Sequence, residues 1–211
     1  MMRGTGRAVV PVIVAAVALA GCSPSGGTDT GAGTGKNGDG APVAGAAPEK
    51  GVTLGTPGSA CELPVTFALV AGWEPEAVKV DPDSELAELG RQGSATMVCE
   101  IDAKPAGNIG YLRVWQGEGS TAPRAALEDF VAGDANAAEA SYKESEAGTV
   151  PAVEVTYTVE AELLDERRTE RAFAVTTPKG PVVVHLGGLD PAEHEAMLPA
   201  YELARKTLRL G

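Results

Sequence analysis

The chain is short of basic residues. It has 17 Lys and Arg against 29 Asp and Glu, which gives a formal net charge of -12 at pH 7. Proteins that bind nucleic acids neutralise phosphates with clustered Lys and Arg. The charge balance therefore excludes nucleic acid as a partner.

Residues that carry catalysis or bind metal ions are also scarce. The two histidines, His185 and His194, lack a partner at zinc-protease spacing, and no Ser lies in a GxSxG sequence. The glycine-rich stretch 31–36 lacks the flanking residues of a phosphate-binding loop. We expect no catalytic residue, no metal site and no cofactor. We interpret His185 as a core or edge residue of a strand, and His194 as part of an exposed helix turn.

An acidic run could in principle hold calcium. It consists of Glu160, Glu162, Asp165 and Glu166. The run lacks the glycine and the terminal bidentate glutamate of a known calcium-binding loop. We therefore interpret it as the solvated end of a strand.

The apolar run near the N-terminus is too short to cross a bilayer. It covers residues 8–19, with Pro11 inside it. Twelve residues in a helix span about 18 Å, against a hydrocarbon core of about 30 Å. Arg3 and Arg7 precede the run and small residues follow it. This layout is typical of a secretory signal peptide, which we assign to residues 1–21.

The signal peptide ends in Leu19-Ala20-Gly21-Cys22, which resembles a bacterial lipobox. The resemblance implies that a lipid with acyl chains such as palmitate is attached to Cys22 before cleavage. We therefore expect a membrane-bound protein on the outer face of the cytoplasmic membrane, anchored through Cys22. The alternative is a signal peptide cut elsewhere, which would leave Cys22 an unmodified thiol.

Residues 22–58 are expected to form a flexible tether. Residues 23–58 contain 11 Gly, 4 Pro and 7 Ser or Thr, with no apolar periodicity. Residues 59–211 are long enough for a single globular domain.

The domain is predicted to be α+β. Alternating or continuous apolar residues predict strands at 62–70, 95–102, 109–116, 153–159, 171–176 and 181–186. Pro123 and Gly133 bracket a helix over 123–132, and Asp190 caps a second helix that Pro199 is expected to kink or divide. The expected fold is a mainly antiparallel sheet of about six strands covered by two or three helices.

This order of elements resembles the PsbP-like fold of LpqN-type lipoproteins of actinobacteria. The resemblance rests on the first strand followed by Gly72-Trp73, the helix after the strand ending at Trp115, and the terminal helix over 199–208. It implies a PsbP-like fold, a Gram-positive actinobacterial source and a non-catalytic binding role, with no catalytic set to carry over.

Three cysteines leave one pair once Cys22 carries a lipid. Cys61 and Cys99 lie 38 positions apart, without CxxC spacing and without a nearby His. In an oxidising compartment we expect them to form a structural disulfide, in preference to a metal or redox site.

Aromatic residues are rare, and four residues form a candidate binding patch. The chain has 2 Trp, 4 Tyr and 3 Phe. Strand alternation places Tyr111, Arg113 and Trp115 on one face, and Trp73 is the other tryptophan. The alternative is that this face belongs to the helix-covered core, with Arg113 extending out at its edge.

The leading interpretation is therefore a lipid-anchored, non-catalytic binding module of the cell envelope. Its partner would be an envelope protein or a small-molecule ligand. A small extracytoplasmic enzyme of the hydrolase type, with a site assembled only in three dimensions, is the alternative. The length leaves little room for a two-lobed solute-binding protein.

Overall fold

A computed structural model describes residues 49–81, 83–85, 87–161 and 166–211. The expected signal peptide, the lipobox with Cys22 and the tether up to residue 48 lie outside the described residues. The elements of the domain, in chain order, are β1 (Lys50–Leu54), β2 (Val65–Val70), β3 (Glu74–Ala77), η1 (Ala87–Gly90), β4 (Arg91–Gln92), β5 (Ala95–Asp102), η2 (Lys104–Ala106), β6 (Gly110–Gln116), α1 (Pro123–Ala132), β7 (Ala137–Ala147), β8 (Val150–Ala161), β9 (Glu166–Thr177), β10 (Gly180–Gly188), α2 (Pro191–Thr207) and β11 (Arg209–Leu210).

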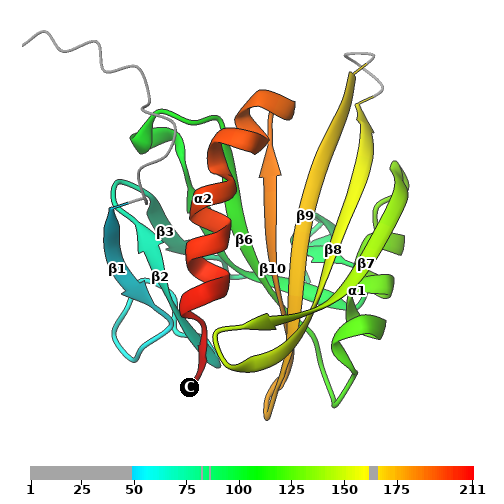
Figure 1. The fold of residues 1–211 in the computed structure, drawn as a ribbon. Helices are drawn as coiled ribbons and strands as arrows, with labels where there is room; N and C mark the ends of the chain where they lie inside the picture. Colours follow the sequence, from blue (N-terminus) through cyan, green and yellow to red (C-terminus); the bar gives the residue numbers. More distant parts are fainter. Residues whose placement is uncertain (1–48, 82, 86, 162–165) are drawn as a thin grey trace, which may run out of the picture. The chain divides into compact units, whose positions relative to one another are not determined.

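The strands form two sheets (Figure 1). The larger has eight strands in the order β3-β5-β6-β10-β9-β8-β7, with β4 paired to β5 outside this path. The smaller has the order β1-β2-β11. All paired strands run antiparallel, as expected where short turns connect neighbours. The fold is thus α+β, but with more strands than the six expected.

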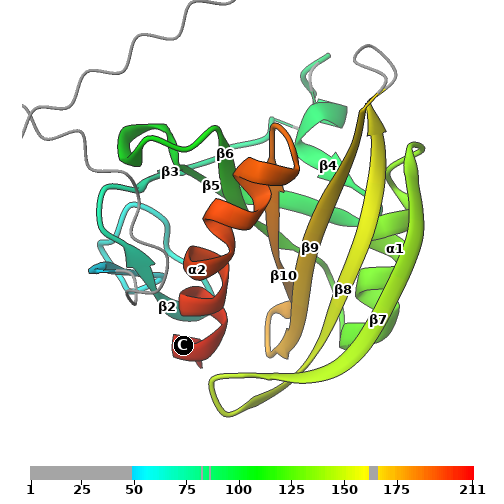
Figure 2. The same cartoon turned by 45° about the horizontal axis from the view of Figure 1, so that its top comes forward.

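The two helices cover opposite faces of the large sheet (Figures 1 and 2). Helix α2 packs against Leu112, Val114, Val184 and Leu186, in a core that includes the inner face of β2. The α1 side has a second core, and its residues are Ala95, Trp115, Leu127, Phe130, Val131, Val153, Val155, Tyr157, Val159, Ala172, Ala174 and Val183. Because successive residues of a strand point to opposite faces, β6 and β10 contribute to both cores.

Helix signals read from the sequence correspond closely to the observed helices. Helix α1 begins at Pro123, as the proline predicts, and buries Leu127, Phe130 and Val131 at helical spacing. In α2 the Asp190 side chain accepts a hydrogen bond from the backbone N–H of Glu193 at 2.9 Å, a standard N-cap. The expectation that Pro199 divides this helix is wrong, because α2 continues through it to Thr207.

Five strands were not predicted from the sequence, and two of them, β4 and β11, have only two residues each. Strand β1 lies among residues that were assigned to the tether, and it pairs with β2. Strand β7 is a sheet edge whose side chains are largely exposed, so it has no apolar alternation to detect. Strand β3 has four residues, all at least partly exposed. Weak burial on both faces removes the signal on which strand prediction depends.

None of the helices among the described residues is both long enough and apolar enough to span a membrane.

Candidate functional site

The predicted aromatic patch does not form as one surface. Tyr111 and Arg113 do lie together, with the Arg113 guanidinium carbon 3.5 Å from the centre of the Tyr111 ring. Arg113 also binds Glu100 of the neighbouring strand, with Nε 2.6 Å from the carboxylate oxygen. Both side chains are half-buried. They are the part of the patch that solvent reaches.

Both tryptophans of the patch are core residues instead. Trp115 is 3% exposed and packs edge-on against Phe130 of α1, with ring centres 5.4 Å apart. Trp73 is 6% exposed and belongs to the core on the opposite, α2 side of the sheet. The four residues therefore share no surface, because alternation assigns residues to a face without showing which part of that face a helix covers.

A buried polar cluster lies next to this position on the α1 side of the sheet. It consists of Tyr157, Glu170 and His185, one from each of β8, β9 and β10, and each is 4% exposed or less. The Glu170 carboxylate oxygen lies 2.7 Å from His185 Nε2 and accepts a hydrogen bond of 3.0 Å from the Tyr157 hydroxyl. The rings of Phe130 and Tyr111 pack edge-on against His185.

The cluster is held together by charge. Burial by itself would raise the pKa of the Glu170 carboxyl, but attraction to His185 and hydrogen bonds from His185 and Tyr157 outweigh it and lower the pKa. Burial, and after it the Glu170 charge, raises the pKa of Tyr157 far above its ordinary value. The cluster is therefore stable with an ionised Glu170 and a neutral Tyr157.

The cluster contains residue types that act in catalysis, but its side chains are closed off from solvent. His185 Nδ1 has no hydrogen-bond partner among the described residues. Neither a cysteine nor a serine takes part in the cluster's described hydrogen bonds. A general base must reach the proton it removes. Because its three side chains are sealed in the core, the cluster instead cross-links adjacent strands. This agrees with the interpretation of His185 as a core residue.

His194 differs from its expected place on an exposed turn. It is 2% exposed, on the inner side of the first turns of α2, where its backbone lies against Gly188. Burial lowers the pKa of its imidazole. His194 precedes the buried Met197 by three positions, so both side chains lie on the same, inner face of the helix.

The acidic run is described only in part. Glu160 is exposed and pairs with Arg167 at 3.0 Å, as expected for a solvated strand end. Glu162, Asp165 and the side chain of Glu166 lie outside the part of the chain that the structure describes. In the part of the chain that the structure describes, no group of three or more His, Cys, Asp or Glu could hold a metal ion.

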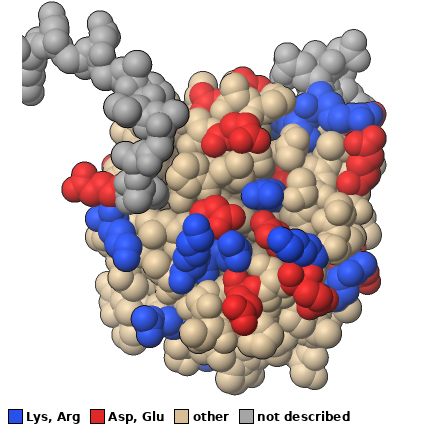
Figure 3. Space-filling model, in the orientation of Figure 1, with Lys and Arg blue, Asp and Glu red and all other residues tan. Residues whose placement is uncertain are grey.

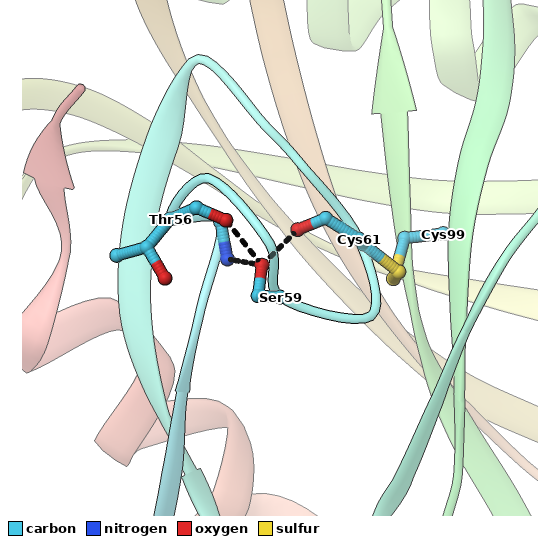
Figure 4. Close-up of a disulfide and its surroundings, with 5 residues drawn as sticks. Thr56, Ser59, Cys61 and Cys99 are labelled. Carbon is cyan, nitrogen blue, oxygen red and sulfur yellow. Dashed lines mark hydrogen bonds between the residues drawn. A yellow bond between two sulfur atoms is a disulfide. The ribbon is translucent and has the colours of Figure 1, made fainter.

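Cys61 and Cys99 form a disulfide, with Cα atoms 5.9 Å apart (Figure 4). Cys61 lies just before β2 and Cys99 lies within β5, so the bond joins segments of the two sheets. The Ser59 hydroxyl closes the loop before it by bonding the Thr56 and Cys61 carbonyls, each at 2.7 Å. Both cysteines are fully buried, which favours a structural bond over a redox function.

A surface pocket of about 470 Å³ lies where the small sheet meets the end of α2. We call it the basic pocket; it is lined by Lys50, Gly51, Thr53, Thr66, Phe67, Ala68, Gly148, Thr149, Lys206, Thr207, Leu208 and Arg209. These residues come from β1, β2, the β7–β8 turn, the end of α2 and β11. Three of the twelve are basic and none is acidic.

Two close contacts fix the walls of the basic pocket. The Thr207 hydroxyl accepts a hydrogen bond from the backbone N–H of Ala68 and donates one to the Leu203 carbonyl, which ties β2 to α2. Gly148 has a positive φ of 58°, and a Cβ there would lie 2.0 Å from the Leu208 carbonyl oxygen. Only glycine permits this approach of the turn to the helix end.

The basic pocket was not predicted from the sequence. Lys50 falls in the segment assigned to the tether, and Lys206 and Arg209 belong to a helix end and a two-residue strand. No spacing in the sequence connects residues more than 150 positions apart. The sole signal available was the concentration of Lys and Arg in the last seven residues.

The chain belongs to a lipoprotein family. The model of a family described as uncharacterised lipoprotein matches residues 31–208, most of the sequence. The expectation of a lipoprotein is thereby confirmed at the level of the family, which fits an extracytoplasmic location with membrane anchoring. Among curated proteins, no sequence matches the chain.

The fold has a structural relative among solved proteins. The chain is similar to cyanobacterial PsbP from Synechocystis sp. PCC 6803, with 11% sequence identity and a TM-score of 0.44. The similarity covers 70% of this chain and 87% of that one. This similarity carries no argument about the fold or the function of the chain. The LpqN type and the actinobacterial source stay predictions.

Proposed function

We propose that this protein is a lipid-anchored binding module of the cell envelope, held through Cys22 on the outer face of the cytoplasmic membrane. Membership of a lipoprotein family and the sequence Leu19-Ala20-Gly21-Cys22 support the anchor. The segment between Cys22 and the first strand is long enough to act as a flexible spacer. A tethered binding domain has a raised effective concentration for partners near its anchor.

The proposed binding role rests on the difference between the polar cluster and the basic pocket. The polar cluster has catalytic residue types but is sealed inside the sheet. The basic pocket is accessible, but none of its twelve lining residues is His, Cys, Ser, Asp or Glu. Lys and Thr line the pocket, but the residue types used most often as general acids, general bases and activated nucleophiles do not. An accessible pocket with binding groups and without this chemistry favours a binding module over an enzyme.

Membrane fractionation tests the anchor. Cys22→Ala should release the protein from the membrane fraction or leave it unprocessed, because the acyl chains can no longer be attached. Mass spectrometry of the wild-type N-terminal peptide should show the lipid on Cys22. A wild-type peptide without lipid, together with unchanged fractionation of the variant, would refute the anchor.

A substrate screen tests the absence of catalysis. The purified protein should turn over no substrate in a broad panel for hydrolases. Turnover that a His185→Gln variant loses, while its thermal unfolding shows an intact fold, would instead establish the enzymatic alternative. His185 is the residue of the polar cluster whose type acts most often in acid–base catalysis, so this substitution is the most direct test.

A further inference from the structure

We infer that the basic pocket binds the phosphate group of a polyol or sugar phosphate. This inference rests on the proposed function, because it names the ligand class of the binding module. It depends on the charge, the hydrogen-bonding groups and the size of the pocket.

Charge distinguishes the basic pocket from the rest of the domain. The chain carries 29 acidic and 17 basic residues, yet this pocket is lined by three basic residues and no acidic one. A second pocket is lined by both Glu62 and Lys179, and a third by both Asp81 and Lys79. Acidic and basic side chains are interspersed over the face that carries α2 (Figure 3). A concave site lined by one sign of charge concentrates ligands of the other sign.

The basic groups are available to a ligand. Lys50 and Arg209 are exposed and have no ion pair within the described parts of the chain. Lys206 lies 3.6 Å from Glu202, but it is 68% exposed and Glu202 also binds Arg205 at 2.8 Å. An exposed ion pair contributes little. Lys206 can therefore turn to an anion at small cost.

Hydroxyl groups suit the remainder of the ligand. Thr53, Thr66 and Thr149 line the pocket, and none of the hydrogen bonds among the described residues uses their hydroxyls. A hydroxyl both donates and accepts, as the hydroxyls of a polyol do. Two lysines and an arginine supply the donors that phosphate prefers. The arrangement thus fits a phosphate with hydroxyl groups beside it.

The pocket has room for a ligand larger than inorganic phosphate. The volume of about 470 Å³ falls in the range of small-molecule sites, about 300–1,000 Å³. A bare phosphate would fill only a small part of it. The same polyol phosphate chemistry occurs in a free sugar or glycerol phosphate and in a phospholipid headgroup.

Calorimetry on a chain that begins at Ser23, and so lacks both the signal peptide and the lipid on Cys22, tests the inference. We expect sn-glycerol 1-phosphate to bind, and uncharged glycerol to bind at least about tenfold more weakly, because charge-assisted hydrogen bonds are the strong ones. The variant Lys50→Gln/Lys206→Gln/Arg209→Gln should lose at least about tenfold in affinity for glycerol phosphate. Binding should weaken as salt increases.

A control variant removes one positive charge elsewhere. Lys179→Gln takes a cation from the second pocket and should leave binding unchanged. All variants alter exposed side chains, so their thermal unfolding should match the wild type; should the triple variant unfold, Lys50→Gln and Arg209→Gln are measured singly. Absent binding of glycerol phosphate and of phospholipid headgroups, or equal losses in the triple variant and the control, would overturn the inference.

Vesicles separate the two sources of the ligand. Binding of the same lipid-free chain to phosphatidylcholine vesicles containing phosphatidylglycerol, lost in the triple variant, would assign the pocket to a headgroup. Binding of free glycerol phosphate without vesicle binding would assign it to a soluble ligand. Either result supports the pocket. A membrane anchor confirmed at Cys22 alongside no phosphate binding would leave the proposed function standing and refute only this inference.

Discussion

Trp115 lies where β6 meets α1, and its side chain fills the space beside Phe130. Replacing a buried tryptophan by alanine leaves a cavity as well as losing contacts. We therefore expect Trp115→Ala to lower the free energy of unfolding by about 3–5 kcal/mol. Urea unfolding followed by circular dichroism measures this. A loss within about 0.5 kcal/mol, the usual range of surface substitutions, would contradict the core position.

Arg113 is the matched control for Trp115, because it lies two positions earlier on the same strand and points to the same face. Its ion pair with Glu100 is partly exposed, with 28% and 39% of the two side chains accessible. Such a pair contributes about 0–1 kcal/mol. Arg113→Ala should therefore change stability far less than Trp115→Ala.

Glu170 gives the domain a dependence on acid. Its pKa is lower in the folded chain than its ordinary value of 4.5, because its attraction to His185 and the hydrogen bonds it accepts outweigh the effect of burial. The stabilisation is therefore complete above about pH 4.5, where the unfolded chain is also ionised, and is lost as the pH falls through the lower folded value. Glu170→Gln should lower stability at pH 7 and remove this part of the decline in acid.

The measurement is the midpoint of urea unfolding at intervals between pH 7 and pH 3. Glu128→Gln removes an exposed carboxylate that pairs with Arg124 and serves as the control. It should leave both the stability at pH 7 and the acid decline close to those of the wild type. Parallel pH profiles for wild type and Glu170→Gln would show that Glu170 is not the source.

At the scale of the element, β1 belongs to the fold even though its sequence resembles the tether. Leu54 is 1% exposed, and β1 pairs with β2 over its length with one irregularity. A chain beginning at residue 59 would lose β1, one wall of the basic pocket and the burial of Leu54, which alone contributes about 1.5–3 kcal/mol. We expect it to unfold at a lower temperature than a chain beginning at residue 49.

Calorimetric unfolding of the two shortened chains and of the mature chain makes this comparison. The chain from residue 49 should match the mature chain, since it keeps every described element. Equal unfolding temperatures for all three would mean that β1 adds nothing to the stability of the domain.

The elements that could be predicted are those with a buried face. Strand β2 alternates Val65, Phe67 and Leu69 with more exposed residues, as expected, and β5 and α1 have the predicted bounds. Strand β7 could not be predicted, because it is paired on one side only and held by backbone bonds to β8. Backbone pairing is independent of side-chain type, so it leaves no trace in an apolar pattern.

At the scale of the whole molecule, the two sheets are joined by sequence-distant contacts. The disulfide joins the loop before β2 to β5. Strand β2 also packs against α2, a helix near the other end of the chain. The basic pocket lies at this junction. An overall acidic chain thereby presents a local basic site, which the net charge of -12 conceals.

The sequence alone determined the α+β class, both helices, the pairing of Cys61 with Cys99 and the expectation of a lipoprotein. These follow from local signals, such as helix caps and strand alternation, or from simple counts, as with the cysteines. Only the tertiary structure decided that Trp73 and Trp115 lie in separate cores. It also decided that Lys50, Lys206 and Arg209 line the same pocket. The physical reason is that burial and proximity depend on how faces pack together, which is a property of contacts between distant segments.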